Sequence, residues 1–225
     1  MQTLVQFWKG FKLLPSAWLL LVQLNMLILY LVTSSSRSDQ ILTWALGVLA
    51  LLMIAKVIRQ TPVYSAIGLF FVAGALVFSI LMLIGLGSVT IQVTAHVFEA
   101  AAYFCAAYGL VRYMFEDRYL TKDELFAAGA VFTLLAWAFA FLYSICQLLV
   151  PNSFQNPNHV GEYQTWLDLL FLSFSLQSAT GLSDVIPLAP AARMVAMLQM
   201  FCGVMYLALI VSRLIALQYI VHKTE

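Results

Sequence analysis

A short polar strip, SATGLSD, runs from Ser178 to Asp184 between two long apolar stretches of the chain. Its side chains offer one carboxylate and three hydroxyl groups, those of Ser178, Thr180 and Ser183. Hydroxyl and backbone carbonyl oxygens can replace the water molecules around a cation, and a ring of carboxylates attracts one. A single glycine, Gly181, lets the backbone turn its carbonyl groups at low cost. These residue types indicate chemistry with cations.

The composition of the whole chain is that of an integral membrane protein. Of its 225 residues, 63% are hydrophobic and 9% are charged, whereas soluble domains have about 45–50% apolar and about 25% charged residues. The formal net charge of +1 and the scattered Lys and Arg residues argue against a nucleic-acid partner. We therefore expect the lipid bilayer to be the first partner of this protein.

Six apolar runs are long enough to cross about 30 Å of hydrocarbon as helices. They are Ser16–Val32, Ile41–Ile58, Val63–Leu86, Ile91–Tyr113, Leu125–Val150 and Arg193–Ile220. Between the last two lies a shorter apolar run, Leu167–Phe174, which is typical of a re-entrant helix rather than a span. The predicted fold class is an all-α integral membrane protein with six transmembrane helices and a re-entrant helix before the polar strip.

Lys and Arg residues in short loops indicate how the helices cross the membrane. With a cytoplasmic N-terminus, the inner side carries Lys9, Lys12, Lys56, Arg59, Arg112, Arg118, Lys122, Arg213 and Lys223. The outer side then carries Arg37 and Arg193. We therefore expect a multi-pass protein of the cell (inner) membrane, with both termini cytoplasmic and the polar strip opening outward.

The predicted spans divide the chain into three parts. Residues 1–15 combine aromatic and Lys residues, as an amphipathic interfacial segment would, and a long flank of the first helix fits this pattern equally well. Residues 16–115 form a four-helix membrane domain, in which Arg112 alone stands in place of the regular arginines of a voltage sensor. Residues 116–225 hold two long helices, the short helix and the polar strip.

Residues from about Tyr113 to Tyr219 resemble the potassium-channel superfamily in its bacterial six-transmembrane form. The resemblance lies in the order of outer helix, short helix, polar strip and inner helix, and in stretches such as DLLFLSFSLQSATGLSD. It implies a homotetramer in which 116–225 is the pore domain, with Leu167–Ser178 as pore helix and 178–184 as selectivity filter. It also implies K⁺ as the permeant ion, with Na⁺ as the alternative, and no cofactor.

The strip departs from the family filter, TTVGYGD, at three positions of an ungapped alignment. Ala179 replaces the ion-coordinating threonine, Leu182 the tyrosine and Ser183 the second glycine. Ser178 and Thr180 could restore the missing hydroxyl ring if the strand is rotated. Because Ser183 would reach a left-handed conformation only at a cost of roughly 1 kcal/mol, we expect another backbone path at this end of the filter.

These departures predict a filter with fewer oxygen rings than the family has. A cation channel gains selectivity from the number and field strength of its coordinating oxygens, so the preference for K⁺ over Na⁺ should be weaker. The best-ordered cation ligands should be the carbonyl groups near Thr180 and Gly181. Phe171 and Ser175 stand where relatives often have an aromatic donor and a carboxyl group that brace the filter from behind.

Three further residues are candidates for regulation. His96 and Glu99 share one face of the fourth helix, and an ionisable pair at membrane depth suggests a proton or polar sensor. The alternative is a buried pair that holds the helices together. Gly203 matches the gating hinge of the family, and close helix packing is the alternative there.

The sequence thus favours a homotetrameric channel for monovalent cations. The alternative is a non-conducting or regulatory membrane protein that has kept the fold and lost the filter. No GxGxxG, P-loop or HExxH motif occurs in the chain, and no nucleophile and base stand at a plausible spacing. We therefore do not expect an enzyme.

Overall fold

The structure is a computed structural model that describes residues 15–32, 52, 65–85, 87–116, 122–157 and 163–223. The predicted interfacial segment 1–15, apart from its last residue, lies outside the described residues. So does the predicted second span, Ile41–Ile58, apart from residue 52. The division into a four-helix domain and a pore domain stays a prediction.

Helices occupy the other predicted apolar runs. The long ones are α2 (Pro15–Val32), α4 (Ser65–Leu83), α5 (Val89–Glu116), α6 (Lys122–Leu149) and α8 (Pro190–Lys223). The short run forms α7 (Trp166–Gln177), and the polar strip begins at the next residue. Strands β1 (Phe154–Gln155) and β2 (Ile186–Pro187) pair antiparallel.

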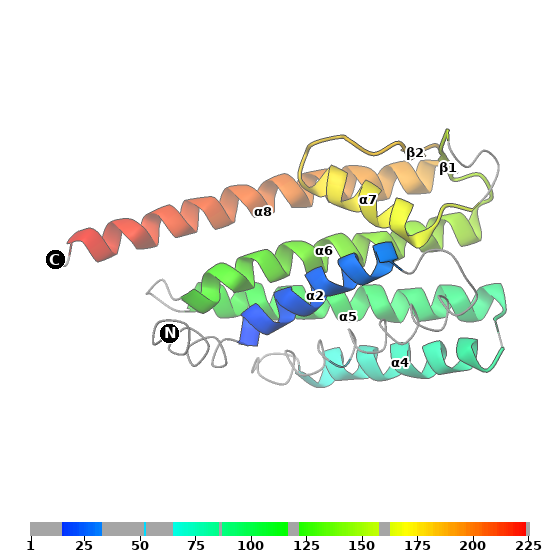
Figure 1. Cartoon of the computed structure of the whole chain (residues 1–225), viewed down its shortest axis with the longest axis horizontal. Helices are drawn as coiled ribbons and strands as arrows, with labels where there is room; N and C mark the ends of the chain where they lie inside the picture. Colours follow the sequence, from blue (N-terminus) through cyan, green and yellow to red (C-terminus); the bar gives the residue numbers. More distant parts are fainter. Residues whose placement is uncertain are drawn as a thin grey trace.

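Helix α6 lies at the centre of the arrangement. It contacts α5 and α2 on one side and α7 and α8 on the other, while α4 packs on α5 (Figure 1). Helices α2, α4 and α6 run in one direction, and α5, α7 and α8 run in the other (Figure 1). Helix α7 starts at the end where β1 and β2 pair, stops part of the way along α8, and the chain then turns back to β2 (Figure 1). This is the re-entrant course that the short apolar run predicts.

Two segments of the described residues are long and apolar enough to cross a membrane. They are Asp123–Leu149 in α6 and Pro190–Arg213 in α8, which correspond to the last two predicted spans. Helix α7 has 12 residues and is about 18 Å long at 1.5 Å per residue, too short to cross about 30 Å of hydrocarbon. The all-α membrane fold is supported, and the total of six spans stays a prediction.

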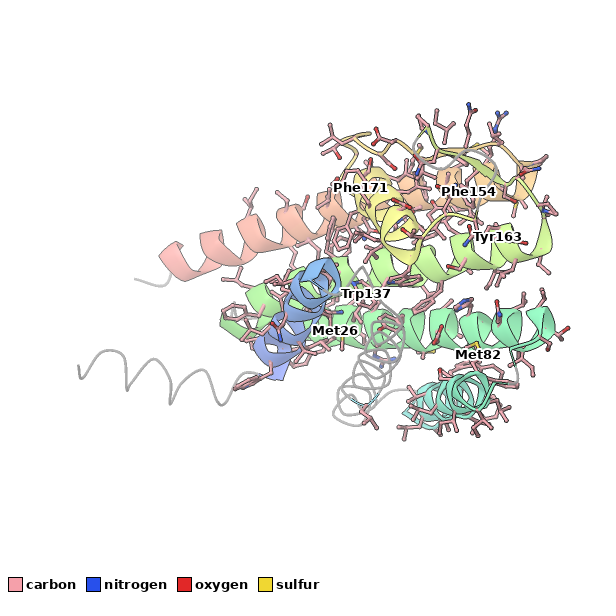
Figure 2. All side chains as sticks on the ribbon, turned by 45° about the vertical axis from the view of Figure 1, so that its right-hand side comes forward. Met26, Met82, Trp137, Phe154, Tyr163 and Phe171 are labelled. Atoms are coloured by element: carbon pink, nitrogen blue, oxygen red, sulfur yellow. The ribbon has the colours of Figure 1, made fainter. Side chains whose placement is uncertain are left out.

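Small residues fill the core where the long helices meet. Ala102 and Ala106 on α5 and Ala127 and Ala130 on α6 are all buried in one apolar cluster. Met26 and Trp137, which are labelled in Figure 2, belong to the same buried cluster. Within a bilayer, helices associate through close packing rather than through exclusion of water, and small side chains let their backbones approach.

One carboxylate joins the beginnings of two helices. Asp123 Oδ1 accepts a hydrogen bond from the backbone N–H of Ser16 at 3.2 Å, and its Oδ2 accepts one from the Ser16 hydroxyl at 3.0 Å. Tyr113 at the end of α5 donates its hydroxyl to Oδ2 at 3.4 Å. The first N–H groups of a helix have no partner within the helix, and a negative charge is favourable there. Asp123 therefore fixes the start of α2 against α5 and α6.

We expect Asp123→Ala to lower the free energy of unfolding by about 1–3 kcal/mol, because it leaves the buried N–H and hydroxyl of Ser16 without an acceptor. Thermal unfolding of the detergent-purified protein, followed by circular dichroism, measures this change. Asp184→Ala is the matched control, because Asp184 is exposed and its removal should change stability by about 0.5 kcal/mol or less. Equal stability of the two variants would show that Asp123 is not a structural anchor.

Candidate functional site

A capping box fixes the start of α7. The Thr165 hydroxyl accepts the N–H of Asp168 at 3.2 Å, and the Asp168 carboxylate accepts the N–H of Thr165 at 3.1 Å. Two of the N–H groups that have no partner within the helix are thereby satisfied at this helix start. The spacing T-x-x-D is visible in the sequence before the short apolar run, but the sequence analysis did not use it.

A buried amide holds α7 against its two neighbouring helices. Gln199 on α8 is 0% exposed. Its Nε2 lies 3.0 Å from the carbonyl oxygen of Ser173, 2.6 Å from the Ser173 hydroxyl and 3.2 Å from Gln177 Oε1. Its Oε1 accepts a hydrogen bond from the Tyr143 hydroxyl of α6 at 2.6 Å. We call these four residues the glutamine network.

The glutamine network also reaches the backbone of α6. Ser173 donates its hydroxyl to the carbonyl of Ala136 at 2.6 Å, and Gln177 donates its amide to the carbonyl of Phe132 at 3.1 Å. An unpaired polar group costs several kcal/mol in an apolar environment, so a shift of α7 by one residue would be expensive. The network therefore sets the position of α7 between α6 and α8.

Helix α8 comes closest to α7 at Gly203. A Cβ atom at this position would lie 2.5 Å from the carbonyl oxygen of Gln177 and 2.9 Å from its Cα. Helix α8 continues through this position without interruption. Gly203 therefore allows α7 and α8 to pack closely, which is the alternative to a gating hinge at this position. The hinge itself stays a prediction.

The polar strip leaves α7 through a left-handed residue just after the helix cap, as many helices do. Ala179 has φ +58° and Gly181 has φ +66°, whereas Ser183 is not among the residues with positive φ. The N–H groups of Ala179 and Thr180 bond back to the carbonyls of Leu176 at 3.2 Å and Ser175 at 3.0 Å, which is the pattern of a Schellman helix end. A non-glycine residue takes the left-handed region at a cost of about 1–2 kcal/mol, and alanine gives no signal of it in the sequence. The expected different path at Ser183 stays a prediction.

Ser175 braces the strip from α7. Its carbonyl oxygen accepts the N–H groups of Thr180 at 3.0 Å and Gly181 at 3.3 Å. The Thr180 hydroxyl donates to the same oxygen at 3.3 Å, and the Ser175 hydroxyl accepts the N–H of Ser183 at 3.2 Å. Phe171 is half exposed and lies on the outer side of α7 (Figure 2). These two residues replace the bracing side chains of relatives, yet Ser175 still braces the strip through hydrogen bonds, whereas none joins Phe171 to the strip within the described residues.

The carbonyl oxygens of the strip are left available. Within the part of the chain that the structure describes, none of them from Ser178 to Asp184 accepts a hydrogen bond. Leu182 is 70% exposed, and the space beside Gly181 is open to at least 4 Å. Irregular backbone cannot face lipid with unpaired polar groups. The open side of the strip must therefore face water or another protein surface.

The hydroxyl groups of the strip do not point outward together. The Ser178 hydroxyl donates to the carbonyl of Phe174 at 2.7 Å and lies 3.0 Å from the Thr180 hydroxyl. Ser183 uses its hydroxyl to accept the N–H of Val185 at 3.1 Å. Both interactions are local, so the carbonyl oxygens of Thr180 and Gly181 stay the candidate ligands for a monovalent cation.

The far end of the strip is tied to the end of α6. Strand β2 pairs with β1, and the carbonyl of Ser153 accepts the N–H of Leu188 at 2.8 Å. Ser153 in turn donates its hydroxyl to the carbonyl of Val150 at 2.6 Å. Both ends of the strip are therefore fixed by buried or paired structure, and only its middle is open.

The ionisable pair of the fourth predicted helix lies on α5. His96 Nδ1 is 2.8 Å from Glu99 Oε2, as the spacing predicts. Glu99 is 6% exposed, and its Oε1 accepts the Ser79 hydroxyl of α4 at 3.5 Å. Among the described residues, no hydrogen bond or ion pair joins this pair to the polar strip. The candidate residues thus form two separate groups.

Comparison with known proteins gives one match. A family model described as an ion channel matches residues 129–218, which is 90 of the 225 residues (218 − 129 + 1). No curated protein and no solved structure matches the chain. The matched segment contains most of α6, the whole of α7, the strip and most of α8. The match covers less than half of the chain and supports a likeness of this segment to the ion-channel superfamily.

We expect Gly203→Ala to lower the free energy of unfolding by about 1 kcal/mol or more, because the added methyl group would overlap the backbone of Gln177. In a helix without this contact, the same change would raise stability by up to about 1 kcal/mol, so the sign of the effect is informative. Thermal unfolding in detergent measures it. Gly87→Ala is the matched control, because a Cβ there meets its nearest atom at an ordinary 3.7 Å. A Gly203→Ala variant that gains stability would rule out the packing role.

Proposed function

We propose that this chain forms a homotetrameric channel that conducts monovalent cations through residues 178–184. K⁺ is the preferred ion, and Na⁺ is excluded less strongly than by a filter with a full set of oxygen rings. The protein acts in the cell (inner) membrane as a multi-pass protein, with both termini cytoplasmic and the strip open to the outside.

The observation that carries this proposal is the orientation of the strip. The N–H groups of Thr180, Gly181 and Ser183 are directed toward Ser175, so the carbonyl groups are free to face the opposite side. Positive and negative φ values alternate at Ala179, Thr180 and Gly181, which aims successive carbonyl groups in a similar direction. Such oxygens can replace the hydration shell of a cation.

The direction of α7 adds an electrostatic contribution. Its C-terminal end leads directly into the strip, and the C-terminal end of a helix carries a partial negative charge equivalent to about half an elementary charge. Four such ends around one axis would favour a cation over an anion. The exposed carboxylate of Asp184 would act in the same direction at the outer mouth.

Other copies of the chain are the proposed cover for the open side. In the apolar stretch of α8 that is long enough to span a membrane, only 22% is buried within the chain. In the corresponding stretch of α6, 61% is buried. Exposed apolar residues occur along α8, among them Met197, Phe201 and Val204. Lipid can cover such a helix, but it cannot cover the polar backbone of the neighbouring strip. A ring of four chains places the strips around water and the α8 helices against one another.

The selectivity of the strip tests this proposal. In liposomes that contain the purified protein, we expect a bi-ionic reversal potential with modest K⁺ over Na⁺ preference. The triple change Ala179→Thr, Leu182→Tyr, Ser183→Gly restores oxygen ligands and the second glycine, so it should raise the permeability ratio. A gain of about 1.4 kcal/mol in discrimination corresponds to a tenfold higher ratio.

The control for this experiment is Leu188→Tyr, which adds an aromatic residue at an exposed position beyond the strip and should leave the ratio unchanged. Steep K⁺ selectivity of the wild type that the triple change does not improve would refute the role assigned to the missing ligands. Tetramers without flux in either protein would favour the non-conducting alternative. A monomer or dimer with residues 178–184 facing lipid would refute the pore itself.

A further inference from the structure

The buried pair on α5 has a direct packing contact with the helix that leads into α7. The imidazole of His96 lies against the phenyl ring of Phe141 on α6, with 5.6 Å between the ring centroids. Phe141 also contacts the indole of Trp166, with 4.5 Å between the ring centroids. Trp166 is the first residue of α7. One phenyl ring thus separates an ionisable side chain from the start of the proposed pore helix.

A second chain of aromatic contacts leads to the same residue. Tyr103, one turn after Glu99 on α5, stacks on Trp137 of α6 with 5.9 Å between centroids and 3° between the ring planes. Trp137 contacts Trp166 edge to face at 6.1 Å. Both sets of aromatic contacts join side chains of packed helices. Because packed interiors transmit strain, a displacement of His96 or Glu99 would be felt at Trp166.

A positive charge on the His96 imidazole would have one negatively charged partner among the described residues, the Glu99 carboxylate. Among the described elements, α4 has no ionisable residue and contributes the Ser79 hydroxyl to Glu99. On α6 the imidazole faces Phe141, while Lys122, Asp123 and Glu124 lie in the first turn of that helix and Tyr143 bonds to Gln199.

The nearest ionisable groups on the remaining elements have other roles. On α7, Asp168 is engaged in the capping box. On α5, Tyr103 stacks on Trp137. The Glu99 carboxylate is therefore the group within the described residues that balances a charge on His96.

We propose that His96 and Glu99 form a proton-binding site that regulates the channel by shifting α7 through Phe141 and Trp166. This regulation rests on the proposed conduction through the strip. The His96 side chain is 18% exposed on the surface of the chain, whereas Glu99 is buried. An imidazole ordinarily gains its proton between about pH 5 and 8.

Protonation changes the forces on both neighbours of the imidazole. The hydrogen bond to the Glu99 carboxylate becomes an ion pair. The ring also becomes a cation beside the phenyl ring of Phe141, and a cation is attracted to an aromatic ring. Because Trp166 also packs on Phe141, the start of α7 shifts, and α7 carries Ser175, which holds the strip.

Ion flux in liposomes at pH 5, 6, 7 and 8 tests the regulation. We expect the flux of the wild type to change about fivefold or more over this range, and the flux of His96→Gln to be independent of pH. In Glu99→Gln, which keeps the imidazole but removes its charged partner, the pH dependence of flux should be weaker than in the wild type. His159→Gln also removes an imidazole and is the matched control, so its flux should depend on pH as the flux of the wild type does. A wild-type flux that is constant with pH, or a full pH dependence in His96→Gln, would overturn the site.

Phe141→Leu tests the route, because it keeps an apolar side chain and leaves both members of the pair in place. It should reduce the pH dependence of flux, whereas Phe78→Leu, which removes a phenyl ring from α4, should not. A Phe141→Leu channel with the full wild-type profile would show that the pair does not act through this ring.

A measurement that does not depend on ion flux can test the proton-binding site separately from ion conduction. The indole NMR resonance of Trp166 in the detergent-solubilised protein should shift between pH 5 and 8 in the wild type and stay constant in His96→Gln. If flux is absent at every pH but this shift is present, conduction fails and the coupling stands. If flux is present and the Trp166 resonance does not respond to pH, the coupling is wrong.

Discussion

The buried amide of Gln199 is the interaction on which the arrangement of α6, α7 and α8 depends. This side chain of α8 is fully buried and bonds to a side chain of α6 and to side chains and backbone of α7. In an apolar environment every one of these groups would be costly without its partner, so the three helices have one favourable register. Because α7 is too short to cross a membrane, it could not hold its position through hydrophobic length alone.

The geometry of the polar strip follows from the position of α7. Gln177 belongs to the glutamine network and also receives the close approach of Gly203, which fixes the last turn of α7. Two residues earlier, Ser175 directs the N–H groups of the strip toward the helix. The left-handed conformation of Ala179 is therefore imposed by its surroundings, because local propensity disfavours it. The helix determines the path of the strip, and the strip residues adapt to it.

Apolar run length was sufficient to predict the long helices that the structure describes, because crossing a bilayer demands a minimum length. The same argument identified α7 as re-entrant, and helical periodicity brought His96 and Glu99 together. The brace of Ser175 was not predictable, because its main acceptor is a backbone carbonyl that any residue would provide. The contact at Gly203 depends on tertiary approach, which has no signal in nearby residues. The left-handed conformation of Ala179 accompanies local hydrogen bonds at the end of α7, but such a helix end usually carries glycine there, and alanine gives no such signal.

The backbone nature of the Ser175 brace has a consequence for how this protein can evolve. Two N–H groups of the strip are held by a carbonyl oxygen, so no single side-chain replacement other than proline deletes that hydrogen bonding. Sequence drift within the strip is then tolerated as long as α7 keeps its place. Alanine scanning would overlook this brace. Replacing the amide of Thr180 or Gly181 by an ester, which removes only the N–H donor, would expose it.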